Sequence, residues 1–176
     1  MKISVLYHSK SGHTEQMARA IAQGASEAAA IEARAIPIED KEESSLEFIR
    51  ESKCVILGSP VYFASICGAV KSWFESDARE LGLPGKLCGG FATADYVHGG
   101  GELAIQSILN HFMVFGMYAY SGGGAFGKPV IHIGPVALSS SLAEQTPTFV
   151  EYGKRMAIAT IDLFGPKNSS GGISAA

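Results

Sequence analysis

Apolar positions in this chain follow two patterns, which alternate from the N-terminus to about residue 165. Short continuous apolar runs, such as 54–58, are typical of buried parallel strands. Longer stretches repeat apolar residues at i, i+3, i+4 and i+7, as Ala18, Ile21, Ala22 and Ala25 do, and predict helices. The predicted strands are 3–7, 31–38, 54–58, 86–93 and 117–121, and the predicted helices are 15–29, 45–51, 68–81, 102–115 and 147–163.

This alternation of strand and helix predicts an α/β fold with helices on both faces of a parallel sheet. We expect a doubly wound, five-stranded sheet in the order 2-1-3-4-5, which brings ligands to the carboxyl ends of strands one, three and four. Strand 31–38 alternates apolar residues with Glu and Arg, so it should lie near an edge.

Four segments complete the expected organisation. A loop spans 59–65, and a Gly-rich excursion covers 122–141 with a small strand at 130–133. The last helix should begin at Pro147 with Thr146 as its N-cap, because proline favours the first helical position. Residues 1–165 therefore form one domain, and 166–176 is a Ser/Gly-rich tail expected to be disordered.

Composition excludes several classes of protein. With 47% apolar and 18% charged residues, the chain is globular rather than disordered. A net charge of -3 and the lack of a basic run argue against a nucleic-acid partner. Three cysteines without CxxC spacing indicate neither a zinc site nor a disulfide framework, and the histidines show no metal-ligand spacing. No apolar run reaches the roughly 18 residues of a membrane span, and the start resembles a strand rather than a signal peptide, so we expect a cytoplasmic protein.

The first candidate site lies between the first strand and the first helix. A helix N-terminus that follows a strand offers free N–H groups and a positive dipole end to a phosphate. The segment adds three hydroxyls and one glycine, although a simple hydroxyl N-cap would also explain one of those hydroxyls. One lysine and no arginine suit a monoester phosphate, such as that of FMN, better than a triphosphate. The segment consists of Ser9, Lys10, Ser11, Gly12, His13 and Thr14.

Two further loops follow the third and fourth predicted strands. They are expected at the same edge of the sheet as the first loop. Their candidate ligand-binding residues are Pro60, Val61, Tyr62, Phe63 and Ala64 in the second loop, and Thr93, Ala94, Asp95, Tyr96, Gly99 and Gly100 in the third. A competing glycine pattern at 122–127 matches the dinucleotide fingerprint in letters, but Lys128-Pro129 follows it instead of a helix start, so we interpret it as a loop.

These three loops resemble those of a known family. Ser-x-Ser-Gly-x-Thr after the first strand resembles the FMN phosphate loop of the flavodoxin-like superfamily. The segment 59–65 resembles the Gly-Thr/Ser-Pro-x-x-Phe-Gly loop of WrbA-type NAD(P)H:quinone oxidoreductases, and 93–101 is similar to that family's Ser-Thr-Gly-Thr-Gly-Gly-Gly turn. The resemblance covers nearly the whole chain.

The resemblance implies an FMN-dependent oxidoreductase that takes electrons from NAD(P)H and reduces quinones or similar acceptors. The flavin would carry the chemistry, so no catalytic side chain is assigned and no metal is expected. Tyr62, Phe63 and Tyr96 would flank the isoalloxazine, although each could equally be a packing residue, and we expect Tyr96 to stack on the ring. The resemblance also implies a dimer or tetramer, for which the helix carrying Trp73 and Phe74 is the expected surface.

The chain departs from the family in four places. The stretch between Glu75 and Lys86 is shorter and lacks the family's Trp-bearing segment, and the connection after the second strand is also short; in the family both features help to build the tetramer and the nicotinamide site. Phe115 stands where the family usually has a histidine near the flavin, and Asp95 to His98 lengthen the third loop. Two alternatives therefore stay open: a flavodoxin that only transfers electrons between partners, and a flavodoxin-fold domain that no longer binds flavin.

Overall fold

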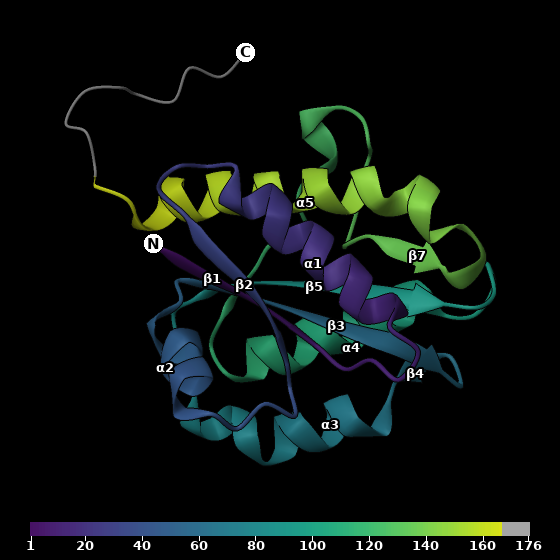
Figure 1. The fold of residues 1–176 in the computed structure, drawn as a ribbon, viewed down its shortest axis with the longest axis horizontal. Coiled ribbons are helices and arrows are strands. Elements are labelled where there is room, and N and C mark those ends of the chain that lie inside the picture. The colour runs from purple at the N-terminus through teal and green to yellow at the C-terminus, as the bar shows by residue number, and fades with distance from the viewer. Residues whose placement is uncertain (167–176) are drawn as a thin grey trace.

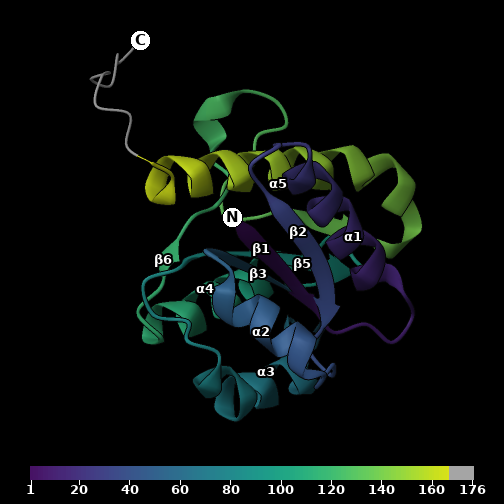
Figure 2. The ribbon, with the colours of Figure 1, turned by 60° about the vertical axis from the view of Figure 1, so that its left-hand side comes forward.

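Helices cover both faces of a twisted parallel sheet in the computed structural model, which describes residues 1–166 (Figure 1). Apart from Pro166, the predicted tail lies outside the described residues. The helices α1 (His13–Ser26) and α5 (Leu142–Phe164) pack together on one face. The opposite face is covered by α2 (Glu43–Glu51), α3 (Gly68–Glu75) and α4 (Gly101–Val114), as Figure 2 also shows.

The sheet has seven strands, so the prediction of five was wrong in number. Five parallel strands follow one another across it in the order β2-β1-β3-β5-β6, which is the succession predicted for the parallel strands. Two short strands join them: β4 is antiparallel to β3, and β7 is parallel to β5. The bounds are β1 Lys2–Tyr7, β2 Glu32–Pro37, β3 Cys54–Tyr62, β4 Ser65–Ile66, β5 Leu87–Ala94, β6 Tyr118–Ala119 and β7 Val136–Leu138.

The segment predicted as the loop 59–65 is largely strand. The strand β3 continues to Tyr62, and the chain turns back at Phe63 and Ala64 into β4. Both turn residues have positive φ, 49° and 59°. A two-residue hairpin turn with two left-handed residues matches the twist of the flanking strands, and it normally uses Asn and Gly. Phe and Ala there hold strained backbone, which the sequence pattern did not indicate.

Two short strands, β6 and β7, share the edge of the sheet beyond β5, where one continuous fifth strand was predicted. The strand β6 pairs with Leu87 and Cys88 at the start of β5, whereas β7 pairs with 92–94 at its end. The expected strand 117–121 is therefore only two residues long, and the small strand predicted at 130–133 is at 136–138 instead. The chain leaves the sheet between these two strands and returns at Gly134, where an added Cβ would lie 2.2 Å from the Gly90 carbonyl oxygen.

Two helices differ from their predicted bounds. The helix α5 begins at Leu142, so Pro147 lies inside it and Thr146 does not cap it: the Thr146 hydroxyl donates to the Leu142 carbonyl at 2.9 Å. The extra turn is held against β7, because the Leu138 N–H donates to Gln145 Oε1 at 2.7 Å. The helix α3 ends at Glu75, and a 3₁₀ turn, Asp77–Glu80, follows it.

The helix α3 does not offer the apolar surface expected of it. Trp73 and Phe74 are 4% and 3% exposed, in the core layer between the sheet and the helices α2, α3 and α4. Phe74 packs edge-on to both Trp73 and Phe112, with ring centroids 5.2 Å apart in each pair. The proposed association surface on this helix was therefore wrong, because its aromatic side chains point inward.

Two further structural results concern the chain as a whole. Cys54 and Cys88 are buried in the strands where they were predicted. Within residues 1–166, none of the helices combines the length and apolarity that crossing a membrane requires.

Candidate functional site

The three predicted loops meet at the carboxyl ends of β1, β3 and β5. The first of them enters α1 through Gly12, whose φ of 87° lies in the left-handed region that favours glycine. Gly12 itself is the N-cap, and no side chain caps the helix. The hydroxyls of this loop are therefore not needed for capping, and the N–H groups of the first turn remain available to an anion.

Two hydroxyls of this loop have different surroundings. Thr14 Oγ1 is buried and lies 2.8 Å from Thr93 Oγ1, so it joins the first loop to the third. Ser9 Oγ is buried but has no hydrogen-bond partner among the described residues. A buried polar atom without a partner is costly and calls for an explanation such as a ligand. A phosphate oxygen would supply the missing partner of Ser9.

A hollow continues from this loop between the second and third loops. Its inner part, a cavity of about 230 Å³, is lined at the phosphate-loop end by Ser11 and His13. Its outer part, about 370 Å³, is lined by Phe63, Ala64, Tyr96 and Gly99. The two parts share four lining residues, Val61, Tyr62, Ala94 and Asp95. Together they have the size of a ligand site, which is about 300–1,000 Å³.

The second and third loops touch each other closely. A Cβ added to Gly100 would lie 2.7 Å from the Cα of Ala64, so only glycine fits there. Gly100 has a φ of 91° and is the N-cap of α4. The strained turn at Phe63 and Ala64 is thus braced by the start of a helix, which explains how its backbone is held.

Aromatic side chains stand at the mouth of the hollow. Tyr62 is 42% exposed and Tyr96 76% exposed, and both line its outer part. Lys10 Nζ lies 5.9 Å from the centroid of the Tyr62 ring, which places a cation of the first loop over an aromatic of the second. Large exposed aromatics beside a cavity fit a flat aromatic ligand better than they fit packing within one chain.

One residue of the site was missed from the sequence. Ser139 lines the inner cavity, and its hydroxyl donates to Asp95 Oδ1 at 2.8 Å. It reaches this position because β7 pairs with the end of β5. The only available signal was the serine run at 139–141, which has no chemical pattern of its own.

The structure brings together at this edge the residues predicted to bind cofactor, with two qualifications. Phe63 is fully exposed, so its ring stands at the rim of the hollow. Phe115 does not belong to the site within one chain: it follows the C-terminus of α4, about 20 Å along the 14-residue helix from Gly100. There its ring stacks at 6.3 Å on that of Phe74.

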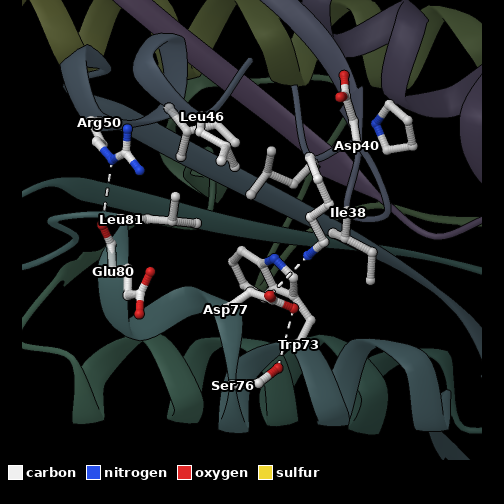
Figure 3. Close-up of a pocket in the computed structure, with 13 residues that line it drawn as sticks. Ile38, Asp40, Leu46, Arg50, Trp73, Ser76, Asp77, Glu80 and Leu81 are labelled. Atoms are coloured by element: carbon white, nitrogen blue, oxygen red, sulfur yellow. Dashed lines mark hydrogen bonds and ion pairs between the residues drawn. The ribbon is translucent and has the colours of Figure 1, made fainter. Parts of the chain in front are cut away.

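A second cavity, of about 260 Å³, lies between α2 and the α3 region (Figure 3). The two cations that line it are already paired: Lys41 with Asp77 at 2.9 Å, and Arg50 with Glu43. None of the predicted cofactor-binding residues lines it. The cysteines are equally poor candidates for chemistry, because burial raises the pKa of the Cys88 thiol to about 12 and also raises that of Cys54.

Comparisons with known proteins identify the family and the fold. The family model described as flavodoxin matches residues 5–131. A flavodoxin from Clostridium saccharobutylicum is 38% identical and covers 93% of this chain and 100% of its own length. An NAD(P)H dehydrogenase (quinone) from Caulobacter vibrioides is 27% identical, over 93% of this chain and 99% of its own. The crystal structure of a WrbA-like flavodoxin from Agrobacterium tumefaciens superposes with a TM-score of 0.74 at 24% identity, covering 92% of this chain and 98% of that one.

Proposed function

The chain belongs to the flavodoxin family, and from this premise we propose that it binds FMN and works as an NAD(P)H-dependent oxidoreductase of quinones or similar acceptors. The observation that carries the proposal is the N-terminus of α1, which no side chain caps, with Ser9 Oγ buried and unpartnered in the loop before it. Ser11 and His13 of the same segment line one end of a hollow whose other end has aromatic walls. A ligand that carries both a phosphate and a flat ring matches this arrangement: the phosphate suits the helix N-terminus, and the ring suits the aromatic walls.

The chemical types of the residues at this site, and their positions along it, suit FMN. Ser9, Ser11 and the first N–H groups of α1 would hold the phosphate, with neutral donors and one nearby cation, Lys10. Tyr62 and Tyr96 would flank the ring, and the backbone of the second and third loops would supply donors to its polar edge. Bound FMN would supply the two-electron chemistry between NAD(P)H and acceptor.

The protein's own part in the reaction would be to bind, orient and expose the flavin. The outer cavity opens to solvent beside Tyr96, so a nicotinamide or a quinone could approach there without a lid having to open. The cytoplasm is the setting we propose, because it supplies NAD(P)H and keeps thiols reduced, and all three cysteines are free.

A flavodoxin that only carries electrons is the second candidate. It is favoured by the 38% identical relative from Clostridium saccharobutylicum, which is named flavodoxin and is matched over its whole length. The oxidoreductase is favoured by relatives named NAD(P)H dehydrogenase (quinone), of which the one from Caulobacter vibrioides also matches over almost its full length.

One experiment separates these functions. The purified protein is loaded with FMN, and its absorbance is followed under anaerobic conditions after NADH or NADPH is added, and then after a quinone. Bleaching by a nicotinamide and recovery with quinone support the oxidoreductase. Reduction by dithionite alone identifies a carrier, and failure to retain FMN overturns both proposals.

A further inference from the structure

The two edges of the sheet are protected differently. At the β2 edge, Glu32 and Arg34 are exposed and paired, with Arg34 Nε donating to Glu32 Oε1 at 3.0 Å. Charges on an edge strand are a common way to prevent pairing with another chain. The β6 edge has the sequence Tyr118-Ala119-Tyr120 and carries no charge. One edge is therefore blocked against strand addition and the other is not.

The strand β6 also keeps a backbone donor turned away from the sheet. The N–H groups of Tyr118 and Tyr120 donate to the carbonyls of Lys86 and Cys88 on β5, each at 2.9 Å. Because successive residues of a strand point their backbone groups to opposite sides, the N–H of Ala119 faces outward.

Apolar side chains flank this edge on both layers of the molecule. A groove of about 660 Å³ runs between β6 and the C-terminal half of α5, and among residues 1–166 Asp162 is the only charged residue that lines it. In Figure 2, β6 lies at the left-hand side between α5 and α4. Four large exposed apolar side chains line the groove: Tyr118 on β6, Phe126 on the excursion, and Ile158 and Leu163 on α5. Two more, Met113 and Val114, are exposed at the C-terminal end of α4, a few residues before β6 in the chain.

We infer that this face is where a second copy of the chain docks, with the two β6 strands pairing antiparallel about a twofold axis at Ala119. The Tyr-Ala-Tyr sequence is the same read in either direction, so each Tyr118 would face the partner copy's Tyr120. The six exposed side chains, 49–87% accessible, correspond to on the order of 600 Å² of apolar surface. That is most of the roughly 800 Å² per partner that a stable interface buries.

A copy of this chain fits the face better than a charged protein partner does. The described residues place one acidic group in the groove, so they offer almost nothing to complement a basic or acidic patch. Depletion of charge at the centre of a contact is typical of homodimers. The face also lies at the amino end of β5, away from the cofactor loops at its carboxyl end, so docking leaves those loops open.

The test is sedimentation velocity of the full chain from about 1 to about 100 µM, a range that spans dissociation free energies of roughly 5–8 kcal/mol. The wild type should be a dimer in the upper part of this range. Ile158→Glu places a charge in the groove, and Ala119→Pro removes the outward N–H, which an edge strand tolerates. Each should raise the dissociation constant at least tenfold while the FMN affinity stays unchanged.

The matched control is Leu103→Glu at the N-terminal end of α4, where the leucine is 63% exposed against 55% for Ile158; it should leave the dimer intact. Circular dichroism spectra and thermal unfolding of each variant show that the fold is kept. A wild type that stays monomeric up to about 100 µM overturns the inference. This holds whether the groove is open to solvent or is occupied by another segment of the same chain. A dimer that neither Ile158→Glu nor Ala119→Pro weakens overturns it as well.

Discussion

At the scale of single residues, Ser9 and Ser4 make a matched pair on and just after β1. Ser4 Oγ is buried 2.7 Å from Ser52 Oγ, whereas Ser9 Oγ is buried without a partner among residues 1–166. Ser9→Ala should therefore weaken FMN binding by roughly 1.5–3 kcal/mol, which is about 10- to 150-fold, without destabilising the flavin-free protein. Fluorescence titration and thermal unfolding measure the two effects.

The Ser4→Ala variant is the control for Ser9. It should lower the free energy of unfolding by about 1 kcal/mol and leave the FMN affinity unchanged, because its hydroxyl serves the core alone. If Ser9→Ala destabilises the flavin-free protein and binds FMN as tightly as the wild type, the phosphate assignment fails.

Tyr96 is the residue at which stacking can be measured directly. Tyr96→Ala should weaken FMN binding by about 0.5–1.5 kcal/mol beyond the loss of buried area and shift the visible absorbance of the bound flavin. Val97→Ala, at the neighbouring exposed position, should change neither. An unchanged spectrum in Tyr96→Ala, with a changed sedimentation coefficient, would instead assign the ring to contact with another chain.

The residue types of the site could be predicted because short-range spacing encodes them. Hydroxyls and a glycine between a strand and a helix carry their own chemistry, and the order of the strands brings the three loops together. Ser139 could not be found in this way, since its place depends on β7 pairing with β5 across about 40 residues of chain. The place of Phe115 beyond the C-terminus of α4, stacked on Phe74, likewise could not be found from its position in the sequence.

At the scale of elements, the excursion between β6 and β7 is held by one buried guanidinium. Arg155 of α5 donates to the carbonyls of Pro129 at 2.9 Å and Gly123 at 3.0 Å, and pairs with Glu151 at 3.2 Å. Arg155→Met should lower the free energy of unfolding by about 2–4 kcal/mol and make 120–135 the first site of proteolysis, because buried carbonyls lose a charged donor.

Lys154→Met is the control for this element. Lys154 is the preceding residue of the same helix and forms a surface ion pair with Glu27 at 2.7 Å. Loss of an exposed ion pair should leave the free energy of unfolding nearly unchanged, and the proteolysis pattern should stay that of the wild type. Equal protection of 120–135 in both variants would show that Arg155 does not hold the excursion.

The start of β5 is joined to the end of α2 by Lys86, whose buried ammonium donates to the carbonyls of Ile49 at 2.8 Å and Arg50 at 2.7 Å. Burial, and secondarily the charge of Lys53, lowers the Lys86 pKa to about 8 from its ordinary 10.5. The folded state then binds fewer protons than the unfolded state between pH 8 and 10.5, so this group makes stability rise with pH across that interval.

The expected gain from Lys86 is about 1 kcal/mol between pH 7 and pH 9. Urea unfolding at both pH values measures it, and Lys86→Met, which has no such group, should lack this increment. If the stability of the wild type and that of Lys86→Met change equally between pH 7 and pH 9, Lys86 does not titrate in this range. The two carbonyl hydrogen bonds would then offset the effect of burial on its pKa.

Element boundaries were predictable where periodicity fixes them and not where distant contacts do. The central strand and α1 follow from local pattern. The strand at β3 runs on to Tyr62 because Val61 and Tyr62 pair with β4. The helix α5 starts early because Gln145 is held by β7. Each of these extensions depends on a partner strand that no local pattern predicts.

At the scale of the whole molecule, one ligand should join all three loops and discriminate among flavins by its phosphate. We expect FMN to bind about a hundredfold more tightly than riboflavin, a difference of about 2.7 kcal/mol, and FAD to bind weakly because its phosphate is not terminal. Isothermal calorimetry with the three ligands gives the comparison. Equal affinities for FMN and riboflavin would show that the phosphate contributes nothing to binding, and would contradict the role proposed for the first loop.

The fold as a whole was the most predictable feature, since alternating strands and helices with right-handed crossovers admit few arrangements. The sequence did not predict which apolar side chains lie on the surface. Trp73 and Phe74 were expected at an interface because α3 appeared more apolar than one domain can bury, but the sheet and α4 bury both rings. The uncharged edge at β6 is visible only once the strand order is known.

The burial of Trp73 has an optical consequence. It is the only tryptophan in the chain, and it is 4% exposed, edge-on to Phe74 in one core layer and at the wall of the cavity between α2 and the α3 region. Its emission should therefore be blue-shifted and come from a single environment. Oxidised flavin absorbs in the region where indole emits, so FMN in the loops would accept excitation from this one donor across a fixed separation. The decrease in Trp73 fluorescence on addition of FMN should therefore report the fraction of protein that has bound the cofactor, without any attached dye.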